Sequence, residues 1–97
     1  MYKFRSRYVV DTGVVEVLRY KDGQMCVHFV GEDARVVVSV NLSDYGLVAP
    51  EGFFFTRDYA EAEGYAFALE EAGIADRMAR FVFGPFDSVG YLMRLVV

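Results

Sequence analysis

The sequence predicts an α+β protein, in which an antiparallel sheet of five to six strands carries one amphipathic helix packed on one face. Three features of the 97-residue chain indicate this class. Short segments of alternating apolar and polar residues, separated by turn residues, fill the first half. A segment with an apolar repeat of three to four residues follows, and two strand-like runs end the chain. The length is typical of one domain, which we place at residues 1–97.

The first strand is expected at the N-terminus, where apolar and basic residues alternate. The apolar positions share one parity and are Tyr2, Phe4, Tyr8 and Val10. The basic positions share the other parity and are Lys3, Arg5 and Arg7. Because successive side chains of a strand point to opposite faces, we expect the aromatic rings inside and a basic ladder outside. Asp11-Thr12-Gly13 is expected to end this strand.

Two further strands are expected over residues 14–20 and 25–30. Lys21-Asp22-Gly23 between them is a strong hairpin signal, because glycine tolerates the left-handed backbone that such a turn needs. Gly31-Glu32-Asp33 is the next turn signal. The first half therefore resembles an antiparallel meander.

Residues 34–41 are rich in valine and predict another strand. Val36, Val38 and Val40 lie on one face, and Val37 begins the other face, so both faces are apolar. A strand with two apolar faces is typical of the centre of a sheet. Residues 42–52 contain serine, aspartate, glycine and proline and are expected to form a loop.

Residues 58–72 predict one amphipathic helix of about four turns. Its apolar stripe consists of Tyr59, Ala62, Tyr65, Ala66, Leu69 and Ala72. Asp58, followed three residues later by Glu61, resembles a capping box, and Gly73 suits the position after the last turn. Gly64 inside a helix costs roughly 1 kcal/mol relative to alanine, so we expect a packing or functional reason for it.

Two more strands, over residues 77–83 and 90–97, are expected around the Gly84-Pro85 turn. The positions that we expect in the core are Val36, Val38, Val40, Tyr65, Leu69 and Leu95.

The net charge of −4 is unevenly distributed along the chain. Residues 44–76 contain eight acidic residues and one base, Arg57, whereas the segments on both sides carry a small excess of bases. A concentration of acidic residues repels nucleic acid and attracts basic partners, although it also serves to keep a protein soluble. There is no apolar run long enough to span a membrane, and Cys26 is the only cysteine. The N-terminal MYKFRSRYVV has no apolar segment of the kind that a signal peptide contains, so we expect none. These features predict a cytoplasmic protein that does not associate with membranes.

Neither a catalytic site nor a cofactor or metal site is expected. Cys26 and His28 share one face of a predicted strand, about 6.5 Å apart, but no residue is evident that would orient the histidine. We interpret both as structural. The carboxylate pairs Glu61/Glu63 and Glu70/Glu71 do not converge on a helix, because only residues three or four apart face one another. We therefore predict that the protein is not an enzyme.

The basic ladder of Lys3, Arg5 and Arg7 could form a platform for single-stranded nucleic acid. Such a platform needs aromatic and basic side chains on the same exposed surface, whereas the alternation separates them. Direct binding of nucleic acid is therefore a minor alternative.

The predicted helix places Phe67 opposite its apolar stripe, among acidic residues. An exposed aromatic side chain surrounded by charge is typical of an interface anchor. Burial of Phe67 within the fold and burial in a homodimer are the alternatives. The predicted partner-binding residues are Phe67, Glu63, Glu70, Glu71, Glu61 and Asp58.

The segment Phe53–Gly84 resembles a small domain family of unknown function that phages, plasmids and conjugative elements carry. The family pattern is an aromatic strand, a basic-Asp-Tyr step, an acidic run that ends in glycine, and a helix that ends in Glu-Ala-Gly. The positions that match it are Arg57, Asp58, Tyr59, Glu61, Glu63, Gly64, Ala68, Leu69, Glu71, Ala72 and Gly73. The preceding VVVSVNLSDYG is also similar. A weaker likeness is to antirestriction proteins, although this chain is shorter and only mildly acidic. The resemblance implies no catalytic residues.

Because such families are carried by phages, plasmids and conjugative elements, the resemblance implies a small protein that acts in the cytoplasm of the host cell and blocks a host defence complex. Restriction enzymes and CRISPR effectors bind nucleic acid through basic grooves, which an acidic helix with a central aromatic residue could occlude. We therefore predict a non-enzymatic inhibitor, of the anti-CRISPR or antirestriction type, that binds the basic surface of such a complex. The alternatives are a self-associating accessory protein without a defence target and a single-stranded nucleic-acid binder that uses the basic N-terminal strand.

Overall fold

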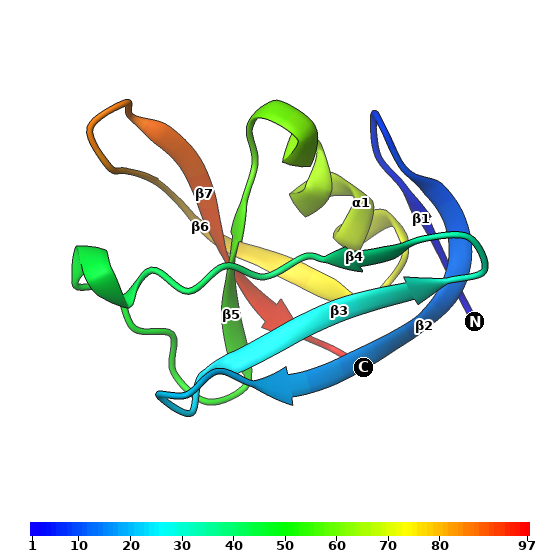
Figure 1. Ribbon diagram of the computed structural model, residues 1–97, viewed down its shortest axis with the longest axis horizontal. Coiled ribbons are helices and arrows are strands. Elements are labelled where there is room, and N and C mark those ends of the chain that lie inside the picture. The colour runs from blue at the N-terminus through cyan, green and yellow to red at the C-terminus, as the bar shows by residue number, and fades with distance from the viewer.

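The computed structural model describes residues 1–97 as an α+β fold with one α-helix and two antiparallel sheets (Figure 1). The N-terminal sheet has the strand order β1-β2-β3-β4, and the C-terminal sheet has the order β5-β7-β6. The elements are β1 (Tyr2–Arg5), β2 (Val10–Arg19), β3 (Met25–Gly31), β4 (Arg35–Val37), β5 (Phe53–Arg57), α1 (Tyr65–Glu71), β6 (Ala75–Phe83) and β7 (Ser88–Leu95). The prediction of a single sheet with five to six strands is therefore wrong, although the α+β class is confirmed.

The first hairpin differs from the prediction because the chain turns earlier than expected. β1 ends at Arg5, and the turn at Ser6–Val9 leaves Tyr8 63% exposed instead of buried. Phe4 is fully buried and Lys3 and Arg5 are exposed, so the predicted alternation is confirmed only within β1.

Asp11-Thr12-Gly13 is not a turn but part of β2. The Asp11 carboxylate is buried and accepts hydrogen bonds from the backbone N–H groups of Thr12, Glu32, Asp33 and Ala34, at 2.8–3.2 Å. These bonds tie the start of β2 to the turn between β3 and β4. Gly13 is needed because a Cβ atom there would lie only 2.0 Å from the carbonyl oxygen of Val30 on β3.

The valine-rich segment forms a short edge strand rather than a central one. β4 contains only Arg35–Val37, and Val37 is 46% exposed on the outer face of the sheet. Beyond β4 the chain crosses to the C-terminal sheet, where Val40 forms an isolated bridge with Phe55. Thr56 reinforces the crossing, because its buried hydroxyl donates a 2.6 Å hydrogen bond to the Val38 carbonyl.

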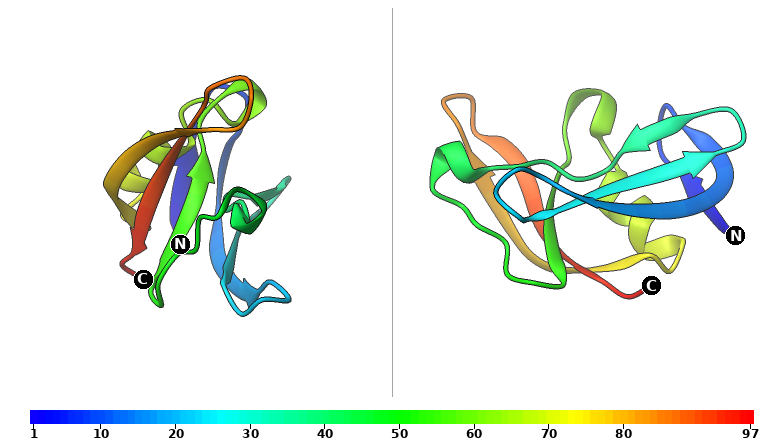
Figure 2. Two further views of the ribbon diagram at one scale, coloured as in Figure 1. Left: turned by 90° about the vertical axis from the view of Figure 1, so that its left-hand side faces the viewer. Right: turned by 60° about the horizontal axis from the view of Figure 1, so that its bottom comes forward.

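The main core lies between the two sheets and α1, which packs against β1, β5 and β6 (Figure 2). Phe4 and Phe29 stack there at 5.2 Å, and Tyr65 of α1 meets Phe4 edge-on at 5.5 Å. Of the expected core residues, Val36, Val38, Tyr65 and Leu69 are buried. Val40 and Leu95 are half-buried at the margins of the core.

A smaller core covers the opposite face of the C-terminal sheet. Leu42, Ala49 and Phe55 are its buried members, and half-buried Phe81 and Phe83 pack around them. The loop over residues 42–52, which contains one 3₁₀ turn at Ser43–Tyr45, supplies this cover. The C-terminal sheet is thus enclosed by α1 on one side and by the loop on the other.

Candidate functional site

The helix begins later than the sequence predicts. α1 spans only Tyr65–Glu71, and a separate 3₁₀ turn at Ala60–Ala62 precedes it. Gly64 joins the two with a φ of +87°, a left-handed conformation that only glycine adopts without strain. Gly64 therefore ends one helical turn and begins the next, which is the reason for a glycine at this position.

Asp58 holds this junction together. Its Oδ1 accepts a 2.7 Å hydrogen bond from the Gly64 N–H, and its Oδ2 accepts a 3.4 Å bond from the Ala66 N–H. The expected capping box with Glu61 is wrong, because Glu61 forms an ion pair with Arg57 at 3.4 Å. Asp58 is half-buried, so it positions the helix and is not part of an exposed acidic surface.

Phe67 projects from α1 into solvent. Its neighbours Ala66, Ala68 and Leu69 are fully buried, whereas Phe67 is 57% exposed. The predicted stripe is confirmed at Ala62, Tyr65, Ala66 and Leu69, and Ala72 packs against the core, but Tyr59 is exposed. Burial of Phe67 within the fold is therefore the wrong alternative.

Most carboxylates around Phe67 are paired with arginines, which the sequence did not predict. Glu63 binds Arg7 of the first hairpin at 3.0 Å, and Glu70 binds Arg77 of β6 at 2.5 Å. With the Glu61–Arg57 pair, three of the four predicted glutamates have a basic partner. The surface around Phe67 is therefore a mixed-charge surface rather than a purely acidic one.

Glu71 forms no ion pair but lies beside the basic ladder. It helps to line a shallow depression of about 390 Å³ between β1 and the end of α1, together with Met1, Tyr2, Lys3, Arg5 and Ala72. The structure thus brings the helix and the basic strand together, two features that the sequence analysis treated separately.

Cys26 and His28 contact one another on the outer face of the N-terminal sheet, where Cys26 Sγ lies 3.3 Å from His28 Nε2. The orienting group that sequence reasoning missed is Arg35, whose Nε–H donates a 3.1 Å hydrogen bond to His28 Nδ1. Arg35 in turn pairs with Glu16 on β2. No spacing rule could have revealed Arg35, because strand pairing alone brings it beside His28.

The direction of the hydrogen bond between Cys26 and His28 is the wrong one for a catalytic dyad. Arginine is a permanent donor, so His28 Nδ1 must be the acceptor and a neutral ring carries its proton on Nε2, facing the sulfur. A histidine that activates a thiol must accept the thiol proton and become a cation.

No group of three or more histidine, cysteine, aspartate or glutamate side chains is arranged to hold a metal ion. The structure contains no helix with the length and apolar character that a bilayer-spanning segment needs. Comparison of the chain with protein-family models, with curated proteins and with solved structures finds no match.

Proposed function

We propose that the protein is a non-enzymatic inhibitor that binds the basic, nucleic-acid-binding surface of a host defence complex through the exposed face of α1. The observation that carries this proposal is Phe67, which is 57% exposed on a helix whose opposite face is fully buried. The resemblance of Phe53–Gly84 to a family carried by mobile elements supports the biological setting.

Phe67 supplies the anchor in this proposal. A large aromatic side chain that becomes buried at the centre of an interface commonly accounts for several kcal/mol of binding energy. The helix beneath it is rigidly held by Leu69 and Ala66 in the core, so little conformational entropy is lost on binding.

The paired carboxylates remain available to a basic partner. Exposed ion pairs such as Glu63–Arg7 contribute about 0–1 kcal/mol, because solvent screens them and long side chains lose entropy. Arginines of a partner can therefore replace Arg7 at little cost, whereas Arg77 holds Glu70 more firmly through its Nε and Nη2 groups, at 2.8 and 2.5 Å. Because most of these charges are already compensated, we expect a weaker salt dependence than four free carboxylates would give.

The experiment measures whether the protein prevents DNA binding by purified CRISPR effector and restriction complexes. We expect Phe67→Ala to raise the dissociation rate from the target complex, at a cost of about 1–4 kcal/mol. Reversal of Glu63, Glu70 and Glu71 to lysine should instead slow association, and salt should reduce that deficit. Tyr8→Ala removes a similarly exposed aromatic residue, 63% against 57% for Phe67, from the first hairpin and is the matched control.

Equal inhibition by wild type and Phe67→Ala would contradict the proposed site. A dimer that light scattering detects and that Phe67→Ala converts to monomer would favour the self-associating accessory protein instead.

Single-stranded nucleic-acid binding is a second candidate, because the first hairpin presents an aromatic side chain and basic side chains together. Tyr8 is exposed, and the Arg7 guanidinium lies 5.4 Å from its ring centroid. Lys3 and Arg5 are exposed on the adjoining strand. A gel shift of single-stranded DNA by the purified protein, lost in Tyr8→Ala and retained in Phe67→Ala, would support this candidate over the inhibitor.

A further inference from the structure

A second exposed aromatic surface lies at the end of the molecule formed by the β6–β7 hairpin and the Ser43–Tyr45 turn (Figures 1 and 2). We call it the aromatic end and define it by Tyr45, Tyr59, Phe83 and Phe86. The proposed inhibitory site does not include any of these residues.

The rings of Tyr45, Tyr59 and Phe83 are held in place from below, whereas Phe86 projects from the adjoining turn. Phe83 contacts Tyr45 at a centroid distance of 5.5 Å and Tyr59 at 6.3 Å. Phe83 also packs on Phe81 at 5.8 Å, and Phe81 meets the buried Phe55 edge-on at 5.2 Å. A continuous series of rings therefore connects this surface to the smaller core.

The outer rings are strongly exposed. Phe86 is 89% exposed, Tyr45 53% and Tyr59 37%. Phe86 lies in the turn between Gly84, with a φ of +74°, and Asp87, with a φ of +53°. A positive φ is uncommon for a residue other than glycine, so the turn is maintained in a costly conformation that presents Phe86 to solvent.

The charged residues that adjoin Tyr45 and Phe86 in the sequence are acidic, whereas Arg57, which pairs with Glu61 at 3.4 Å, lies two residues from Tyr59. No lysine or arginine occurs in residues 36–56 or 81–93, whereas Asp44 and Asp87 adjoin Tyr45 and Phe86 in the sequence. Neither aspartate forms an ion pair, unlike Glu51, which binds Arg19 at 2.7 Å. Exposed rings beside unpaired carboxylates attract cations and repel phosphate groups.

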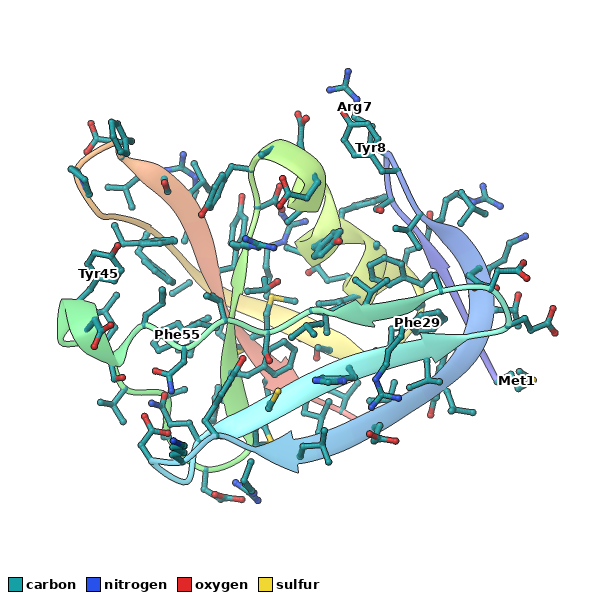
Figure 3. The ribbon with its side chains drawn as sticks, viewed as in Figure 1. Met1, Arg7, Tyr8, Phe29, Tyr45 and Phe55 are labelled. Atoms are coloured by element: carbon teal, nitrogen blue, oxygen red, sulfur yellow. The ribbon has the colours of Figure 1, made fainter.

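We propose that the aromatic end binds an arginine- or lysine-bearing segment of a protein partner, with cationic side chains against the ring faces of Tyr45 and Phe86. Asp44 and Asp87 supply the complementary charge. Protein is the favoured partner, because the unpaired carboxylates of Asp44 and Asp87 oppose nucleic acid and the rings bind guanidinium and ammonium groups by cation–π attraction. This surface is independent of Phe67, whose side chain projects from α1. Figure 3 places Tyr45 at the opposite end of the molecule from Tyr8.

The test uses the whole protein and a short synthetic peptide of alternating arginine and glycine, with a glutamate-glycine peptide as the control probe. Two-dimensional amide NMR should show saturable shifts at Tyr45, Tyr59, Phe83 and Phe86 with the arginine peptide only. Phe86→Ala and Asp44→Asn should each weaken binding about fivefold or more. Tyr8→Ala and Phe67→Ala, which remove exposed rings elsewhere, should leave it unchanged.

Phe86→Ala should stay folded, because the Phe86 side chain is almost wholly exposed. Equal affinity in Phe86→Ala and wild type, or shifts confined to α1, would overturn the proposal, as would burial of the aromatic end in a dimer that excludes the peptide. Failure of the defence-complex assay would leave this result unaffected, so the two proposals are tested separately.

Discussion

The buried carboxylate of Asp11 stabilises the fold by accepting four backbone N–H hydrogen bonds. The backbone N–H of Asp33, followed by those of Thr12, Ala34 and Glu32, holds the pKa of the Asp11 carboxyl below its ordinary value, although desolvation by burial acts in the opposite direction. A depressed pKa in the folded state means that the folded protein favours the ionised form. The contribution is therefore complete above the unfolded pKa of about 3.9 and is lost as the pH falls through the lower folded value.

We expect the stability of the wild-type protein to fall between about pH 5 and the depressed pKa of Asp11, and Asp11→Asn to lose this part of the pH dependence. Asp11→Asn should also be less stable at neutral pH, because its amide cannot accept four N–H bonds. Urea unfolding midpoints at several pH values measure both effects. Asp44→Asn removes an exposed, unpaired carboxylate and is the matched control; the same loss there would contradict the role of Asp11.

At the scale of the element, the start of α1 depends on two residues that act together. Asp58→Ala should destabilise the protein by about 0.5–2 kcal/mol, because it leaves the N–H groups of Gly64 and Ala66 without their acceptor. Gly64→Ala should cost about 1–2 kcal/mol, since the space around it is open and only the backbone conformation is strained.

Glu61→Ala tests the corrected role of Glu61, because alanine can form neither the ion pair nor a capping box. Its exposed ion pair with Arg57 should contribute at most about 0.5 kcal/mol. Thermal or urea unfolding followed by circular dichroism measures all three variants. If Glu61→Ala were as destabilising as Asp58→Ala, the capping-box interpretation would have to be restored.

At the scale of the whole molecule, one core joins both sheets to the helix. Leu69 is fully buried in it, so Leu69→Ala should cost about 2–4 kcal/mol, whereas Phe67→Ala should stay within about 0.5 kcal/mol. Because Phe29 and Met93 of different sheets belong to this same core, we expect one cooperative transition. Hydrogen exchange that shows the N-terminal sheet still protected after β5, β6 and β7 have opened would contradict this expectation.

Local patterns predicted much of the fold and part of the site. The turns at Lys21-Asp22-Gly23 and Gly84-Pro85 and the phase of α1 around Leu69 follow from turn chemistry and periodicity. The exposure of Phe67 follows from that same phase. These are properties of a few consecutive residues, so the sequence alone can express them.

Contacts between distant segments decided the rest. Two sheets form in place of one because the chain is bonded to β3 only as far as Ser39, and Val40 then bridges to Phe55. Asp11-Thr12-Gly13 lies inside a strand because the Asp11 carboxylate is satisfied by N–H groups more than 20 residues away. The composition of Asp11-Thr12-Gly13 is typical of a turn, and it does not show that the N–H groups of residues 32–34 hold Asp11 within a strand instead.

The sequence by itself therefore determined the α+β class, the helical face that is buried and the exposure of Phe67, because amphipathic periodicity is a local property. Only the tertiary structure decided that Glu63 pairs with Arg7, 56 residues away, and that Arg35 orients His28. It also decided that Tyr45, Tyr59 and Phe83 meet at one end of the molecule. The physical reason is that charge compensation and ring packing depend on which segments fold side by side, and no spacing along the chain encodes that.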